Sequence, residues 1–157
     1  MSDVVLTKRG YEELREKLRK MKTTDRQQII KEIQAAAAHG DLSENAEYDA
    51  AKEKQSFIET KIKELEQALA NPKIIDTSTL SSDKVVFGAI VQLEDEDKGE
   101  EVSYQIVGVN EADVALGKIS IKSPIARALI GKEEGDYVEV KTPGGMRSYS
   151  ILGISFQ

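Results

Sequence analysis

The sequence contains no cysteine and no tryptophan, and it has one histidine, His39. The absence of cysteine excludes disulfides, iron–sulfur clusters, thiol catalysis and thiolate zinc sites. One histidine excludes a metal site built from three histidines and argues against a Ser-His-Asp triad. Aromatic residues make up 5% of the 157 residues. Any globular core must therefore be small and mainly aliphatic.

Long apolar runs are also missing. No segment approaches the roughly 20 apolar residues that a membrane helix requires. The first ten residues carry an early acidic side chain and lack the basic and then apolar layout of a secretory signal. We therefore expect a cytoplasmic protein with no membrane partner.

Charge is abundant but unevenly distributed. The net charge is −6, whereas a protein that holds nucleic acid by its phosphates is usually basic. This argues against a stand-alone nucleic-acid binder. Residues 1–76 contain 14 basic and 15 acidic side chains, and residues 77–157 contain 8 and 13. This change, together with a change in hydrophobic pattern, predicts two domains, 1–76 and 77–157.

The first of these domains has the pattern of a helical hairpin. Residues 8–38 predict a long helix with a narrow coiled-coil seam, which Thr23-Thr24-Asp25 interrupts. Residues 44–70 predict a second helix with a heptad seam, and Asn71-Pro72 ends it. Gly40 is a natural stop for the first helix. We therefore expect a long antiparallel coiled-coil hairpin whose tip is residues 39–45.

The second domain has short β-type runs and one helix signal. Ser123 is placed to cap a helix that has Pro124 at its first position and ends before Gly131. Five strands and one short helix predict a small α+β domain with a curved antiparallel sheet. The predicted strands cover residues 85–93, 102–109, 114–121, 137–140 and 149–154.

Two acidic residues at the hairpin tip allow two interpretations. Asp41 and Glu44 are three residues apart at the start of the second helix. They could form a capping box, in which each side chain satisfies a backbone N–H. They could also supply half of a Mg²⁺ site, because Mg²⁺ is commonly held by one or two carboxylates with waters and phosphates. The two interpretations are compatible. No phosphate-binding loop, dinucleotide fingerprint or nucleophile elbow is present.

These residues belong to a segment that resembles a known family. HGDLSENAEYDAAKEKQ, residues 39–55, is similar to the tip signature of the bacterial GreA/GreB transcript cleavage factors. Further segments resemble that family in the same order along the chain. They are LTKRG at 6–10, LREKL at 14–18, VFGA at 86–89, SPIARALIG at 123–131 and KTPGG at 141–145.

The resemblance implies a fold and a function. It implies an N-terminal coiled coil and a C-terminal domain of FKBP-like topology, in a factor that enters the secondary channel of bacterial RNA polymerase. Asp41 and Glu44 would then help to hold a second Mg²⁺ and orient a water for cleavage of the nascent RNA 3′ end in backtracked complexes. The factor would be a monomer with no nuclease activity of its own.

The resemblance also suggests supporting residues. Ser43, Asn45 and Tyr48 lie beside the acids, although local backbone hydrogen bonding is the commoner role for such residues. Lys52 matches the family's basic-patch position and Lys54 is nearby, so both are candidates for RNA contact, with plain surface solvation as the alternative. Ser123 and Pro124 are candidates for polymerase docking.

Three other functions remain open at this stage. A Gre-like protein could enter the same channel and inhibit the polymerase, but such proteins depart from the family at the tip. A prolyl isomerase would share the C-terminal fold, but its pocket requires aromatic side chains that are scarce here. A coiled-coil scaffold would not require paired acids at the tip.

Overall fold

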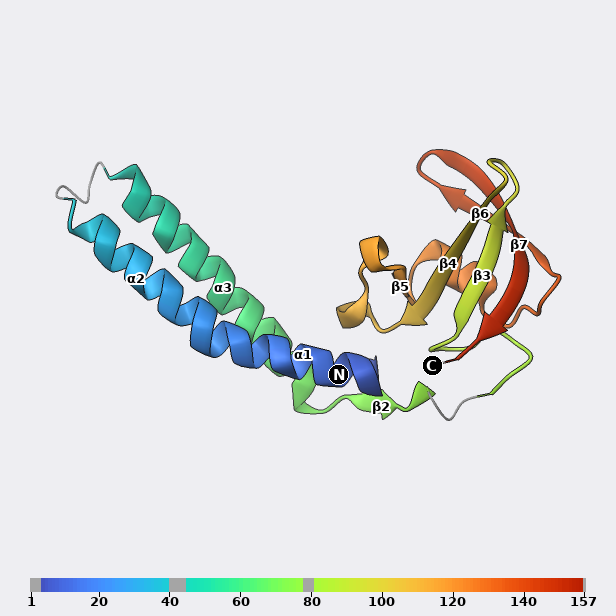
Figure 1. Ribbon diagram of the computed structural model, residues 1–157, viewed down its shortest axis with the longest axis horizontal. Helices are drawn as coiled ribbons and strands as arrows, with labels where there is room; N and C mark the ends of the chain where they lie inside the picture. Colours follow the sequence, from blue (N-terminus) through green and yellow to red (C-terminus); the bar gives the residue numbers. More distant parts are fainter. Residues whose placement is uncertain (1–3, 40–44, 78–80, 157) are drawn as a thin grey trace. The chain divides into compact units, whose positions relative to one another are not determined.

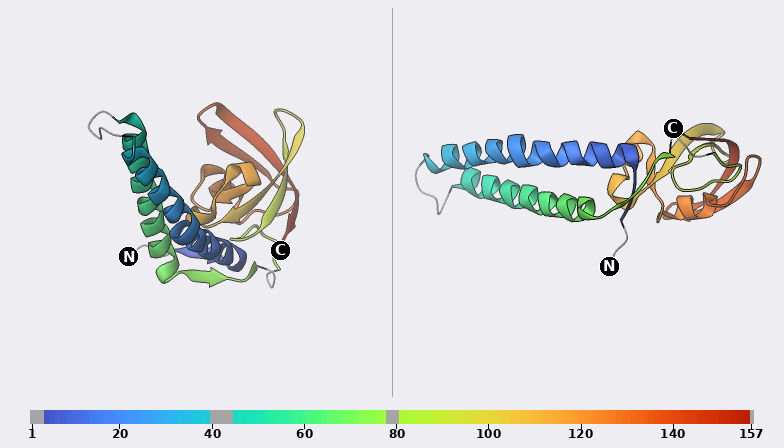
Figure 2. Two further views of the ribbon diagram at one scale, coloured as in Figure 1. Left: turned by 60° about the vertical axis from the view of Figure 1, so that its left-hand side comes forward. Right: turned by 90° about the horizontal axis from the view of Figure 1, so that it is seen from below.

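The structure is a computed structural model that describes residues 4–39, 45–77 and 81–156. The chain forms two compact units. One comprises Glu12–Asn71, and the other combines Met1–Tyr11 with Pro72–Gln157. Figures 1 and 2 show a helical hairpin in the first unit and a curled sheet in the second. Within the described ranges, no helix is both long and apolar enough to span a membrane.

The hairpin confirms the predicted pair of long helices. The first half of the hairpin consists of α1 (Lys8–Lys20), a π-helical segment η1 (Met21–Asp25) and α2 (Arg26–Ala37). Its second is α3 (Ala46–Ala70). The packed seam of α3 is apolar, with Ile62 only 1% exposed, and Ile29 of α2 is equally buried. The seam ends on Ala68, which is buried, and the next residue, Leu69, is half-buried.

The predicted break at Thr23–Asp25 is a change of helix type. The backbone continues through η1 without leaving helical geometry, and Thr23 Oγ1 donates to Arg19 O at 2.8 Å. The first apolar stripe ends at Met21 and the second begins at Ile29, a spacing of eight residues that a regular heptad does not accommodate. A π-helical turn takes up extra residues. Both stripes can therefore face α3.

Two short strands join the ends of the hairpin to the second unit. β1 (Val5–Thr7) pairs in parallel with β2 (Lys73–Ile75), and Leu6 is fully buried there. This pair was not predicted from the sequence, because three-residue strands carry almost no periodic signal. The pair is the reason that the compact units do not follow the change of sequence texture predicted at residues 76 and 77.

The second unit contains a five-stranded sheet with the order β5-β4-β3-β7-β6. Its neighbouring strands are antiparallel except for β4 and β5, which are parallel. The short helix α4 (Pro124–Leu129) packs through Ala126 and Leu129 into the same core as the sheet. The strands are β3 (Ile90–Asp95), β4 (Glu100–Val107), β5 (Lys118–Ser120), β6 (Tyr137–Thr142) and β7 (Gly145–Ser155).

The predicted strand over residues 114–121 is wrong for its first half. Val114–Leu116 forms a 3₁₀ turn, η5, and Gly117 has a φ of 74°. That left-handed conformation suits glycine and interrupts an extended strand. The strand predicted over 85–93 also begins late, at Ile90, because Gly88 has a φ of 89° and turns the chain into the sheet.

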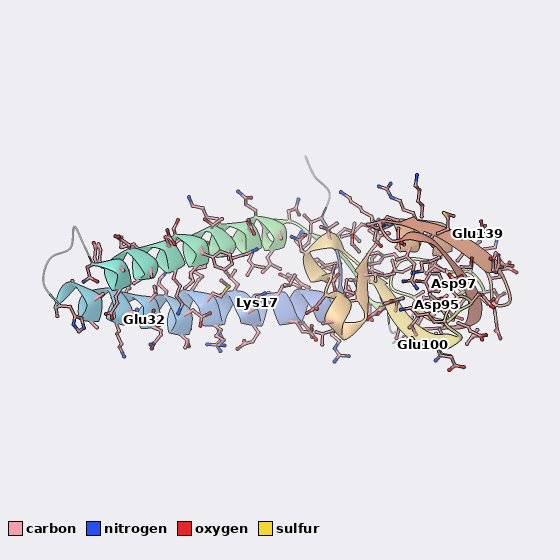
Figure 3. All side chains as sticks on the ribbon, turned by 90° about the horizontal axis from the view of Figure 1, so that it is seen from above. Lys17, Glu32, Asp95, Asp97, Glu100 and Glu139 are labelled. Carbon is pink, nitrogen blue, oxygen red and sulfur yellow. The ribbon has the colours of Figure 1, made fainter. Side chains whose placement is uncertain are left out.

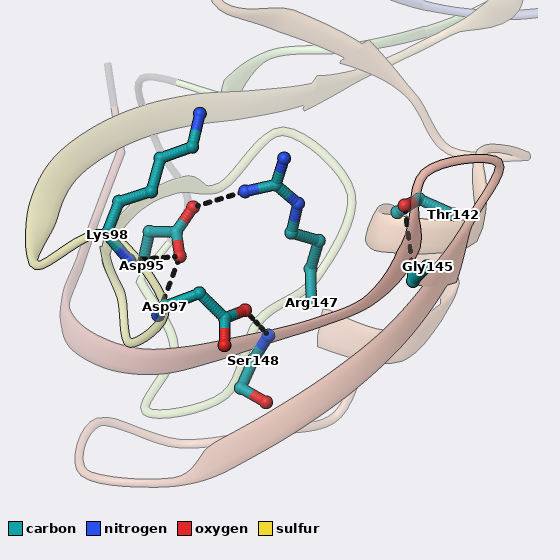
Figure 4. A network of polar contacts seen from close by, with 7 residues as sticks. All are labelled: Asp95, Asp97, Lys98, Thr142, Gly145, Arg147 and Ser148. Carbon is teal, nitrogen blue, oxygen red and sulfur yellow. Dashed lines mark hydrogen bonds and ion pairs between the residues drawn. The ribbon is translucent and has the colours of Figure 1, made fainter.

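A buried aspartate closes the turn between β3 and β4. Asp95 is 6% exposed, and its Oδ1 accepts from the backbone N–H groups of Asp97 at 2.9 Å and Lys98 at 3.2 Å. Its Oδ2 accepts from Arg147 Nη1 at 3.4 Å, and Asp97 Oδ2 accepts from the Ser148 N–H (Figure 4). The acidic turn between β3 and β4 is therefore a structural feature of the sheet.

A carboxylate also fixes the start of α1 within the second unit. Glu111, in the 3₁₀ turn η4 (Val109–Glu111), accepts from the Thr7 N–H at 3.0 Å, from the Thr7 hydroxyl and from the Gly108 N–H at 3.1 Å. Thr7 Oγ1 in turn accepts from the Gly10 N–H at 2.9 Å, which caps the first turn of α1. We call Thr7, Gly10, Gly108 and Glu111 the Glu111 clasp.

Candidate functional site

The hairpin tip carries the two predicted catalytic residues, Asp41 and Glu44, and the predicted supporting residue Ser43, and all three lie outside the described residues. Asp41, Ser43 and Glu44 fall in residues 40–44, so the choice between a capping box and a metal site stays a prediction. The described residues bordering this segment are His39 on one side and Asn45 on the other. Their contacts define the frame from which the tip extends.

Asn45 bonds to both helices of the hairpin. It is the N-cap of α3, where its Oδ1 accepts from the Tyr48 N–H at 3.1 Å. Its Nδ2 donates to Ala36 O of α2 at 2.6 Å. One amide therefore starts the second helix and supplies a partner to a carbonyl at the end of the first helix. The predicted backbone role of Asn45 agrees with these contacts, and Tyr48 takes part through its backbone.

The predicted start of the second helix at residue 44 is two residues early. The structure begins α3 at Ala46 because Asn45 has an extended φ and ψ of −91° and 98°. An asparagine in this conformation can use its side chain in place of the missing helical partner. In SENA, residues 43–46, Asn45 is a residue type that often caps helices, so the sequence alone allowed it as the cap.

Ion pairs join the two helices in an antiparallel ladder. Arg26 Nε and Nη2 donate to the two Glu59 carboxylate oxygens at 2.8 and 2.9 Å. This bonding raises the pKa of Arg26 above its usual value. Two further ion pairs of the described residues are Lys22–Glu66 at 3.8 Å and Glu32–Lys54 at 3.3 Å, and His39 Nε2 lies 3.9 Å from Glu47 Oε2. Figure 3 labels Glu32 among the side chains along the arm.

An open groove of about 400 Å³ lies between the Glu32–Lys54 pair and the contact of His39 with Glu47. Alanines form its floor, and the groove is open because their small side chains do not fill the space between the helices. The groove was not predicted from the sequence, although the alanines at 35–38 and 50–51 fall opposite each other in a hairpin. The groove is lined by Glu32, Ala35, Ala36, His39, Glu47, Ala50, Ala51 and Lys54.

The two predicted RNA-contacting lysines do not share a face of α3. Residues two apart on a helix point to different sides. Lys54 lines the groove and bonds to Glu32, whereas Lys52 Nζ donates to Gln55 Oε1 at 3.2 Å. The structure therefore does not bring Lys52 and Lys54 together into one basic patch.

Residues 4–39, 45–77 and 81–156 contain no group of three or more His, Asp or Glu residues arranged to hold a metal ion. Asp41 and Glu44 supply hard oxygen donors of the kind that Mg²⁺ prefers, but two carboxylates alone make an incomplete site. Any Mg²⁺ at the tip would need ligands from a partner.

Ser123 and Pro124 occupy the positions predicted for them. Ser123 Oγ accepts from the Ala126 N–H at 3.3 Å and donates to Ser120 O at 2.7 Å, and Pro124 is the first residue of α4. Ser123 is half-buried and Pro124 is exposed. Both are explained by helix capping, and the docking role stays a prediction.

Comparison with known proteins identifies relatives along the whole chain. Residues 4–74 match the model for the N-terminal domain of transcription elongation factors, and residues 80–156 match the model described as transcription elongation factor, GreA/GreB, C-terminal. The chain is 55% identical to "Transcription elongation factor GreA" of Alkalilimnicola ehrlichii over 99% of both chains. It is 57% identical to the protein of that name from Brucella anthropi, also over 99% of both.

A solved structure is similar over the same length. The crystal structure of GreA factor homolog 1 from Thermus thermophilus is 33% identical and covers 98% of this chain and 99% of its own, with a TM-score of 0.46.

Proposed function

Because this chain belongs to the GreA/GreB family of transcription elongation factors, we propose that it stimulates transcript cleavage by RNA polymerase. The observation that carries the proposal is the match of both family domains, over residues 4–74 and 80–156, together with relatives named GreA at 55–57% identity. RNA polymerase is the partner, and the hairpin enters its secondary channel.

The hairpin acts as a stalk that carries the tip acids. The ion-pair ladder and the apolar seam hold the two helices together, and Asn45 bonds to both helices at the point where the tip begins. Asp41 and Glu44 then present two carboxylates to the polymerase active centre, where they help to hold Mg²⁺ and accept hydrogen bonds from a water. Bound Mg²⁺ would stabilise negative charge on the oxygens of the RNA phosphodiester.

The protein alone is not the nuclease in this proposal. The tip acids supply too few ligands for tight Mg²⁺ binding, and the polymerase supplies the remaining ligands and the RNA. The factor therefore acts as a monomeric accessory protein that completes another active site.

The test uses a backtracked RNA polymerase complex with labelled RNA and Mg²⁺. We expect the wild-type protein to release short 3′ fragments, and Asp41→Asn or Glu44→Gln to lower the cleavage rate by about 100-fold or more, while polymerase binding is kept. Asp49→Asn is the matched control, because Asp49 is an exposed carboxylate in the first turn of α3. It should cleave like the wild type.

Three results would contradict the proposal. Full cleavage by the Asp41→Asn/Glu44→Gln double variant would remove the role of the acids. Slower RNA synthesis without cleavage by the wild type would identify an inhibitor of the polymerase. Failure of the protein to bind the polymerase would exclude both stimulation of cleavage and inhibition of the polymerase.

A further inference from the structure

The two described residues that border the tip segment, residues 40–44, bond to the same backbone oxygen, Ala36 O. On the amino-terminal side, the His39 N–H donates to Ala36 O at 3.2 Å. On the carboxy-terminal side, Asn45 Nδ2 donates to it at 2.6 Å. Ala36 is 4% exposed and belongs to the packed seam of α2. Both borders of the tip segment are therefore bonded to one buried residue of the hairpin.

The partners of Asn45 determine which way its amide points. The Tyr48 backbone N–H can only donate, so the atom that it meets at 3.1 Å is the oxygen Oδ1. Ala36 O can only accept, so the atom that it meets is the nitrogen Nδ2. Aspartate or serine can also cap a helix, because each supplies an oxygen acceptor. The bond to Ala36 O, in contrast, requires the amide nitrogen of asparagine.

Other contacts hold the helices of the hairpin together without the bond between Asn45 Nδ2 and Ala36 O. Ile62 of the α3 seam is 1% exposed, and Arg26 makes two hydrogen bonds to Glu59 between the two helices. These contacts lie nearer to the base of the hairpin than Asn45 does. The bond to Ala36 O therefore has its main effect at the tip end, where the chain passes from α2 to α3.

We infer that Asn45 is a positioning residue for the cleavage reaction and that it acts through its bond to Ala36 O rather than through its cap of α3. The inference rests on the proposed function. Glu44 precedes Asn45 directly, and consecutive Cα atoms are about 3.8 Å apart, so the place of the Asn45 backbone limits the positions that Glu44 can take. Side chains that orient a metal ligand contribute about 10- to 100-fold to metal affinity or activity.

Two substitutions separate the donor of Asn45 from its cap. Asn45→Asp and Asn45→Ser both keep an oxygen that can cap α3. Neither supplies a donor to Ala36 O, because a carboxylate has none and the serine hydroxyl is one bond shorter. Asn45→Ser also adds no charge, so it distinguishes loss of the donor from an added carboxylate. Asn71→Ser is the matched control, because it makes the same change at an exposed asparagine at the other end of α3.

The experiment uses the full-length protein and a backtracked polymerase complex. At saturating factor, we expect both Asn45 variants to lower the cleavage rate about tenfold and to raise the Mg²⁺ concentration for half-maximal cleavage several-fold. The dissociation constant for the polymerase should stay within about twofold, because both variants keep the hairpin helices. Asn71→Ser should match the wild type in each measurement.

Amide hydrogen exchange of the free protein gives a readout that does not depend on cleavage. In both Asn45 variants, exchange at Tyr48 should stay within about twofold of the wild type, because the cap is kept. Exchange at His39 should rise about fivefold, because Asn45 no longer holds Ala36 O, the acceptor of the His39 N–H.

The outcomes separate the inference from the proposed function. If the wild type does not stimulate cleavage, the proposed function fails and the inference fails with it. If the wild type cleaves, and both Asn45 variants cleave at its rate with the same Mg²⁺ requirement, the inference alone is overturned. It is also overturned if the variants lose activity through weaker polymerase binding. Faster exchange at Tyr48 would overturn it too, since loss of the α3 cap would then explain the effect.

Discussion

Replacing Glu111 with alanine should release the start of α1 from the 3₁₀ turn at residues 109–111. The Glu111 carboxylate accepts two backbone N–H groups, at 3.0 and 3.1 Å, and the Thr7 hydroxyl. Hydrogen bonds to a charged group contribute about 1.5–3 kcal/mol each, and they are not additive when they share one acceptor. Because Glu111 is only half-buried, water replaces part of the loss. We expect the free energy of opening at this site to fall by about 2–4 kcal/mol.

Amide hydrogen exchange measures this opening residue by residue. The Thr7 and Gly10 amides should exchange at least about 30-fold faster in Glu111→Ala than in the wild type. Glu111→Gln keeps one oxygen acceptor and should show a smaller effect. Glu134→Ala is the control, since Glu134 is an exposed glutamate elsewhere in the same unit, and it should leave these amides unchanged.

Gly10 provides an independent test of the Glu111 clasp. A Cβ atom at residue 10 would lie 1.6 Å from Glu111 Oε1, so Gly10→Ala must displace the carboxylate. We expect Gly10→Ala to accelerate exchange at Thr7, and Gly10→Ala combined with Glu111→Ala to be no worse than Glu111→Ala alone. Wild-type protection of Thr7 in Glu111→Ala, or fully additive effects in the double variant, would refute the reasoning.

Three further changes test the hairpin and the sheet. Asn45→Ala removes the α3 cap and should destabilise the hairpin by about 1–2 kcal/mol, seen as faster exchange of the Tyr48 amide, whereas unchanged exchange would count against the cap. Arg26→Met breaks the bidentate pair with Glu59 and should cost up to about 1 kcal/mol in urea unfolding at low salt, and an equal cost at high salt would be inconsistent with an ion pair. Burial raises the pKa of Tyr149 above 10.0, so the unfolded chain loses this proton first and stability falls as pH rises past about 10. Tyr149→Phe should reduce that slope in alkaline unfolding curves, and an unchanged slope would assign it to other groups.

The sequence predicted the features that extend over many residues. Both long helices and the capped helix after Ser123 have strong periodic or terminal signals, and the structure has them all. The strands β1 and β2 and the Glu111 clasp were missed because each depends on contacts between residues far apart in the chain, such as Thr7 and Glu111. No local pattern records such a pair.

The candidate site divides in the same way. The tip motif marked Asn45 as a polar residue of the turn, and its bond to Ala36 O appears only when the two helices are side by side. Lys52 and Lys54 looked like one basic patch because they are close in sequence, but helical geometry points them apart.

The pairing of β1 with β2 has a consequence for the order in which the chain folds during synthesis. Val5–Thr7 emerges from the ribosome before the hairpin, whereas its partners Lys73–Ile75 and Glu111 emerge only after the entire hairpin. The local contacts of the hairpin can form early, since helical pairs close in sequence fold fastest. β1 can complete its contacts only after β2 and residue 111 have been synthesised. A ribosome-bound chain truncated before residue 111 should therefore have a folded hairpin but lack the hydrogen bonds between Glu111 and Thr7.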